Sequence, residues 1–168
     1  MKKHILFALA AGFAAAGGLR AADVSSSRVE VIFDHPDNFN DIRDTYSDTS
    51  GGREYVIREL TKYVARTADE YLPAGQKLKI VFTDVTLAGR LPIQATDDDR
   101  RIYQTTYPPD FKFTYTVTDA SGAVVRQGTD HIRDLDYTTR VLTPPDNTLP
   151  LPYEKAALRD WIRDNLRK

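Results

Sequence analysis

The sequence predicts an α+β fold, in which an antiparallel or mixed sheet of about four to five strands carries two helices on one face. Alternating apolar and polar residues recur along the chain, most strictly over 111–118, and this period of two is typical of strands with one buried face. A central and a C-terminal segment instead repeat apolar residues every three to four positions, as helices packed on a core do. The order strand, helix, several strands, helix favours helices gathered on one side of the sheet.

The N-terminus has the composition of a secretory signal peptide. Lys2 and Lys3 form a positive start, and the 15 residues Ile5–Leu19 form an apolar run. A membrane-spanning helix needs about 18 to 20 apolar residues, and Arg20 interrupts the run before that length. We therefore expect residues 1–22 to be a cleavable signal peptide and residues 23–168 to form a single α+β domain.

The cleavage position leaves alternatives. A cut after Ala22 would place Arg20 three residues before the cleaved bond, where small residues are preferred, so cuts after Ala21 or Gly18 stay open. The mature chain is expected to begin between positions 19 and 23. The chain has no cysteine, and hence no thiol for a lipid anchor. We expect a soluble, exported protein, periplasmic or secreted, with no stable membrane anchor.

Composition limits the classes of function. The absence of cysteine excludes disulfides, cysteine-based zinc sites and thiol nucleophiles. Three of the 23 basic residues and none of the 24 acidic residues lie in the signal region, so the mature chain has 20 basic against 24 acidic residues and a formal charge of −4. This balance argues against nucleic acid as a partner, because a surface that binds nucleic acid must be basic.

The first half of the mature chain contains a predicted strand and a predicted helix. Apolar residues alternate over 29–33, the turn formers of 34–38 end this strand, and a loop is expected over 38–52. From about Arg53 the period changes to that of a helix, which ends at the Pro73-Ala74-Gly75 segment. The apolar stripe of this helix is formed by Val56, Leu60, Val64, Ala68 and Leu72, and is widened by Tyr63, Thr67 and Tyr71.

The second half contains the remaining predicted strands. A β-like run over 76–88 has apolar residues on both faces, and a short strand is expected over 102–106. The strictly alternating segment 111–118 is the clearest strand, and the turn residues 119–122 connect it to a hairpin partner over 123–130.

The C-terminal segment is predicted to be a loop followed by a helix. Four prolines make 141–152 an irregular loop. A closing helix is expected from about Tyr153, with cationic residues near its C-terminal end, where they complement the helix dipole. Its apolar stripe is formed by Leu158, Trp161, Ile162 and Leu166.

Four short segments resemble those of a known family. They are "FNDIRD" at 39–44, "FTDVTLAGRL" at 82–91, "IRDLDY" at 132–137 and "YEKAALRDWI" at 153–162. In this order they resemble the exported bacterial family called domain of unknown function 3016. The resemblance implies export and one shared fold over nearly the whole mature chain, and it implies no activity. Thr86 stands where the family pattern has an acidic residue, which disfavours a metal site built on paired aspartates there.

Polar residues inside the patterned segments are the candidates for a site, because buried charges need partners. They have two interpretations. One is a structural ion-pair network that joins the sheet to the last helix, and the other is a binding groove. The candidates are Asp84, Arg90, Arg133, Asp134, Tyr153, Glu154 and Lys155.

Other motifs favour structural roles, so we expect no cofactor and no metal site. Asp34-His35-Pro36-Asp37 has atoms that bind metals but matches a turn that ends a strand. The run 97–99, three aspartates followed by Arg100 and Arg101, matches a solvated loop, since calcium loops alternate their ligands with spacers. Ser50-Gly51-Gly52 matches a helix start, with an anion site as the alternative. Catalytic residues stay unassigned, because the chain has no cysteine and no Gly-x-Ser-x-Gly motif.

Two hypotheses of function follow. We favour a non-enzymatic envelope protein that binds another protein or an envelope polymer through a sheet edge or the groove beside the last helix. This hypothesis predicts an exposed apolar or aromatic patch near Tyr107, Tyr137 or Tyr153. The alternative is a small hydrolase or ligand-binding protein that uses carboxylates with Arg90 or Arg133 in a pocket, and it predicts a deep concave site.

Overall fold

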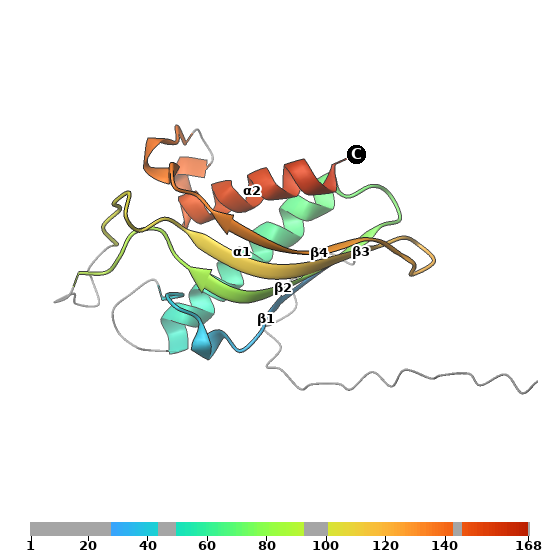
Figure 1. Ribbon diagram of the computed structural model, residues 1–168, viewed down its shortest axis with the longest axis horizontal. Helices are drawn as coiled ribbons and strands as arrows, with labels where there is room; N and C mark the ends of the chain where they lie inside the picture. The colour runs from blue at the N-terminus through green and yellow to red at the C-terminus, as the bar shows by residue number, and fades with distance from the viewer. Residues whose placement is uncertain (1–27, 44–49, 93–100, 143–145, 168) are drawn as a thin grey trace, which may run out of the picture.

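The computed structural model describes residues 28–43, 50–92, 101–142 and 146–167 (Figure 1). Over these ranges the chain forms strands and α-helices joined by turns, in the order β1 (Val29–Phe33), α1 (Ser50–Tyr71), β2 (Lys77–Thr86), β3 (Asp110–Thr118), β4 (Val124–Arg133) and α2 (Pro152–Leu166). None of the helices in this part of the chain is long and apolar enough to cross a membrane. The predicted signal peptide, residues 1–22, lies outside the described residues.

The strands form a mixed, four-stranded sheet in the order β1-β2-β3-β4. β1 runs parallel to β2, with α1 as the crossover between them, whereas β2, β3 and β4 are antiparallel neighbours. Both helices lie on the same side of the sheet (Figure 1), and their apolar residues share a core with it. The predicted α+β fold, with a central and a C-terminal helix, is therefore confirmed.

The core lies between the helices and one face of the sheet. Phe111, Phe113 and Val117 of β3 are buried, while the lysine and threonine between them are exposed, which is the predicted period of two. The indole of Trp161 in α2 packs edge-on against the rings of Phe113 and Tyr115, with centroid distances of 4.9 and 5.1 Å. The other face of the sheet carries exposed polar residues such as Lys112 and Thr114, together with the half-buried Ile32 and Val81.

A β-bulge changes the expected burial of β2. The register with β3 shifts between Phe82 and Asp84. Phe82 and Val85, which have opposite parity, are therefore both fully buried on the helix side. Asp84 consequently lies on the open face of the sheet, and the expectation that it occupies a strand buried on both faces is wrong.

The strand expected over 102–106 is not formed. Ile102 makes only an isolated bridge with Arg90, and the next residues form a turn in which the N–H of Tyr107 donates to the carbonyl of Gln104. The N–H of Tyr107 and the C=O of Gln104 thus bond each other within the turn and do not pair with another strand. At the other end of the sheet, β4 extends past Asp130 to Arg133, because its pairing with β3 continues as far as Asp110.

Candidate functional site

A pocket opens at the end of the sheet where β2 ends and β3 begins. It has a volume of about 600 Å³. Its walls come from the segment that follows β1, the segment that follows β2 and the segment that precedes β3, with Asp110 and Arg133 at the ends of β3 and β4. A cavity of this size is large enough for a small organic ligand or for one unit of a polymer.

Backbone pairing brings the first two segments of the pocket together. The N–H of Asp41 donates to the carbonyl of Val85 at 3.3 Å, and the N–H of Leu87 donates to the carbonyl of Asp41 at 2.9 Å. Gly89 then turns the chain with a positive φ of 69°, and a Cβ at this position would lie 2.5 Å from the carbonyl oxygen of Ile102. Only glycine fits here, and this turn places Arg90 in the wall of the pocket.

Arg101, a buried arginine, connects the segments that form the walls of the pocket. Only 6% of the Arg101 side chain is exposed, and it forms an ion pair with Asp41. Its guanidinium also donates to the carbonyl oxygens of Ala88, Gly89 and Arg43, each at 2.8 Å. The sequence pattern placed Arg101 in a solvated loop, and this expectation is wrong, because backbone carbonyls that are far apart in the chain converge on it.

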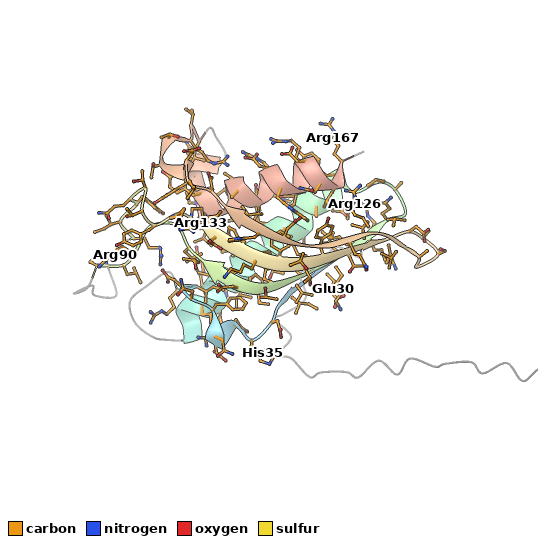
Figure 2. All side chains as sticks on the ribbon, viewed as in Figure 1. Glu30, His35, Arg90, Arg126, Arg133 and Arg167 are labelled. Atoms are coloured by element: carbon orange, nitrogen blue, oxygen red, sulfur yellow. The ribbon has the colours of Figure 1, made fainter. Side chains whose placement is uncertain are left out.

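Three arginines, Arg43, Arg90 and Arg133, line the pocket. Arg90 donates to the hydroxyl of Tyr107 at 2.7 Å and lies over the ring of that tyrosine, and it forms no ion pair with a carboxylate of the described residues. Arg133 is 3.7 Å from Asp110, with 57% of its side chain exposed. Figure 2 shows Arg90 and Arg133 at the same end of the sheet, whereas Arg126 and Arg167 lie at the other end.

The acidic residues of the pocket already have cationic partners. Asp41 is paired with Arg101, and Asp110 contacts both Arg133 and the Nε2 of His131, the latter at 2.8 Å. With Asp41 paired to Arg101 and Asp110 to Arg133, Arg90 is the lining cation that forms no ion pair with a described carboxylate, and Arg133 stays more than half exposed. Guanidinium groups bind carboxylate and phosphate oxygens through paired hydrogen bonds, so the lining is suited to an anionic group.

Asp84 lies on the open face next to the pocket rather than in it. It accepts hydrogen bonds from the backbone N–H of Asn40 and from the ammonium of Lys112, both at 3.1 Å. Partial burial alone would raise its pKa, but these two hydrogen bonds outweigh the burial, and the pKa of Asp84 lies below its ordinary value. Asp84 is thus held ionised as the charge partner of Lys112.

Asp134 joins the end of β4 to α2 through Arg140. The guanidinium of Arg140 donates to Asp134 through Nε and to Asp160 of α2 through Nη1, the latter at 2.6 Å. The predicted partners Asp84, Arg133 and Asp134 are therefore not one cluster. Each lies in a different ion-pair group, and Asp134 is the one that connects the sheet to the last helix.

The first turn of α2 carries two buried charged residues. Glu154 is 1% exposed, accepts a hydrogen bond from the N–H of Ala88 at 2.7 Å, and has no partner for its second oxygen in the described part of the chain. Burial raises the pKa of Glu154 above its ordinary value, although that hydrogen bond and the nearby Arg101 and Lys155 oppose the shift. Lys155 is paired with Glu59 of α1 at 3.1 Å, so this turn joins the two helices.

Aromatic residues pack around the same turn. The ring of Tyr103 lies against Tyr153 and Tyr137, with centroid distances of 4.9 and 6.4 Å. Tyr137 is fully buried, and its hydroxyl bonds the backbone of Gln104 as both donor and acceptor. The large exposed apolar side chains of this region are instead those of Ile102, Tyr103, Leu135 and Val141.

Metal-binding geometry does not occur among the residues that the structure describes, since no group of three or more acidic or histidine side chains is placed to share an ion. Asp34 and His35 form an exposed pair, 2.7 Å apart, in the turn after β1. The acidic run 97–99 lies outside the described residues. Ser50-Gly51-Gly52 forms the beginning of α1, which starts three residues before the expected position.

Comparison with known proteins assigns the chain to a family. Residues 27–164 match the family described as "Protein of unknown function (DUF3016)". The chain belongs to this family. Three of the pocket residues, Asn40, Asp41 and Arg43, lie in the first of the segments quoted above, and Arg90 and Arg133 lie in the second and third.

Other comparisons add little to the family assignment. No curated protein gives a significant match. One solved structure, a PelC dodecamer from Paraburkholderia phytofirmans, is 13% identical, with coverage of 84% of this chain and 87% of that chain and a TM-score of 0.35.

The pattern of polar residues pointed to Arg90 and Arg133 but missed Arg43, Asp41 and Arg101. The signal for two of them was present, since Asp41 and Arg43 stand in the "FNDIRD" segment that carries the family resemblance. No local signal identifies Arg101, whose partners come from the segments after β1 and after β2.

Proposed function

We propose that the mature chain is an exported, non-enzymatic binding domain of the cell envelope, and that the arginine-lined pocket receives an anionic ligand. Export rests on the composition of residues 1–22, and the domain is proposed to comprise residues 23–168. The observation that carries the ligand class is that Arg90 and the largely exposed Arg133 line one pocket in which Arg90 has no described carboxylate partner. Phosphate or carboxylate groups on a small molecule or on an envelope polymer are the anions that such a lining binds.

The ionisation, pairing and burial of the nearby carboxyl groups favour binding over catalysis. A general acid or base must reach the ligand and exchange a proton near the working pH. Asp84 is held ionised by Lys112 and Asn40, and Asp41 and Asp110 are each paired with a cation. Glu154 has the raised pKa that a general acid needs, but its side chain is closed off from solvent. The described residues around the pocket thus favour holding an anion.

Calorimetric titration tests this function. We expect the mature chain to bind inorganic phosphate or glucuronate at low ionic strength, and Arg90→Gln or Arg133→Gln to weaken binding about tenfold, because each removes a charged hydrogen bond worth about 1.5 kcal/mol or more. Added salt should weaken binding as well, since the pocket is open to solvent. Arg167→Gln is the matched control, because this exposed arginine lies at the far end of the molecule (Figure 2).

Two results would contradict the proposal. One is the absence of binding for both anions at low salt. The other is an equal loss of affinity in Arg167→Gln, because this would attribute binding to overall charge rather than to the pocket.

Export makes a separate prediction about the N-terminus. Protein recovered from the envelope or medium of producing cells should begin between positions 19 and 23, as read by mass spectrometry of the intact chain. Detection of a chain that starts at Met1 in the membrane fraction would instead indicate an uncleaved anchor. Replacing Leu6, Leu9 and Phe13 by lysine should abolish export, because it breaks the apolar run.

A further inference from the structure

No described strand pairs with the outer edge of β4. β4 has ten residues and one neighbour, β3, so alternate backbone N–H and C=O groups point away from the sheet. None of these groups bonds to another described segment. β4 contains no proline and no lysine, two residues that commonly protect edge strands, and its β-bulge lies at its start, between Val124 and Arg126. The opposite edge strand, β1, has only five residues. An open edge of this kind is able to pair with another strand.

Two opposite charges flank the centre of this edge. Arg126 and Asp130 pair with Val117 and Phe113 of β3, so both point to the helix side of the sheet, with Gly128 midway between them. Arg126, labelled in Figure 2, forms no ion pair within the described part of the chain. Asp130 accepts a hydrogen bond from the Nε1 of Trp161 at 2.8 Å through one oxygen and leaves the other without a described partner.

We propose that β4 pairs antiparallel with β4 of a second copy of this chain, around a two-fold axis that passes through Gly128. In this register Arg126 of each copy lies opposite Asp130 of the other, which forms two cross-strand ion pairs on the helix side. Cross-strand pairs of this kind stabilise antiparallel sheets.

The charges select this register over its neighbours. Moving the axis by one residue in either direction places neither Arg126 nor Asp130 opposite a residue of the other sign. If the axis passed between Gly128 and Thr129 instead, Arg126 would lie opposite His131. The helices of the two copies would then lie on opposite faces of the sheet. The proposed pairing keeps the helices of both copies on one face of a continuous sheet.

Packing within one chain explains why position 128 is a glycine. A Cβ at Gly128 would lie 3.0 Å from the ring of Tyr115, so the ring of Tyr115 occupies the space above this position. The position on the axis therefore has no side chain of its own and is covered on the helix side by the Tyr115 ring.

Sedimentation velocity of the mature chain, from micromolar to submillimolar concentration, tests the pairing. We expect a reversible dimer. Arg126→Asp should raise its Kd about tenfold or more, because two attractive cross-strand pairs become two repulsive ones. Gln127→Asp is the matched control, since it places an aspartate on the same strand but on the open face, opposite Thr129 of the other copy, and should leave the Kd within about threefold.

Mixing two variants makes the test specific for this register. Arg126→Asp and Asp130→Arg should each dimerise weakly alone, and an equimolar mixture should form a heterodimer at least as tight as the original, because every facing pair is then of opposite sign. Circular dichroism checks that both variants fold. If Asp130→Arg does not fold, the comparison of Arg126→Asp with Gln127→Asp decides. A chain that stays monomeric at submillimolar concentration, or a dimer that Arg126→Asp does not weaken, would overturn the proposal.

Discussion

Replacing Arg101 by methionine is expected to lower the free energy of unfolding by about 3–5 kcal/mol, the range found when one partner of a buried ion pair is removed. The methionine would fill much of the same volume but donate nothing. Asp41 would lose its partner, and the carbonyl oxygens of Ala88, Gly89 and Arg43 would be left without the donor that they share. Urea denaturation at neutral pH measures the change.

Arg90→Met is the matched control for this prediction. Arg90 follows directly after Gly89, yet among the described residues its side chain donates a hydrogen bond to one partner, the hydroxyl of Tyr107. Its loss should cost about 1 kcal/mol or less. Equal effects of the two substitutions would show that Arg101 does not connect the walls of the pocket.

Stability is expected to fall as the pH rises above about 4.5, and Glu154 is the cause. Its pKa is raised in the folded state, so between the ordinary pKa of a glutamate and this raised value the folded chain holds a proton that the unfolded chain has released. The contribution of Glu154 to stability is therefore fully present below the ordinary pKa and is lost as the pH rises through the folded pKa. Within that window the loss is up to about 1.4 kcal/mol per pH unit.

Glu154→Gln should flatten this part of the pH profile, because glutamine is neutral at every pH. Its amide oxygen can still accept the hydrogen bond from the N–H of Ala88. The measurement is the thermal midpoint of unfolding from pH 4 to pH 9 for both proteins. Glu70→Gln, on the exposed side of α1, is the control and should keep the original profile. A profile that is the same in Glu154→Gln as in the original chain would contradict the assignment.

Periodicity predicted the four strands of the sheet and both helices, but it also predicted a strand over 102–106 that is not formed. The alternation in β3 and the three-to-four spacing in α1 each reflect one buried face, and burial of that face is what stabilises the element. The bulge in β2 was not predictable from the same signal. The extra residue between Phe82 and Val85 moves every later side chain of β2 to the opposite face. In the sequence, the apolar residues before and after the bulge therefore look like two apolar faces of one regular strand.

The candidate site was predictable only in part, because its groups come together through the tertiary fold. Arg90 and Arg133 stood out as charges next to apolar patterns, and the structure places both in one pocket. Asp84 and Asp134 stood out for the same reason but lie in separate ion-pair groups. Arg101 sits in a charged stretch that is indistinguishable from a solvated loop until the carbonyls around it are placed.

Arginine side-chain NMR of the mature chain, titrated with inorganic phosphate and separately with glucuronate, tests the pocket most directly. Each arginine has its own Nε–H signal, assignable by single substitutions. We predict that the signals of Arg90 and Arg133 shift together and saturate with one of the anions, while those of Arg126 and Arg167, at the other end of the molecule, stay in place (Figure 2). Signals of all four arginines that move in parallel, or none that moves with either anion, would contradict an anion-binding pocket.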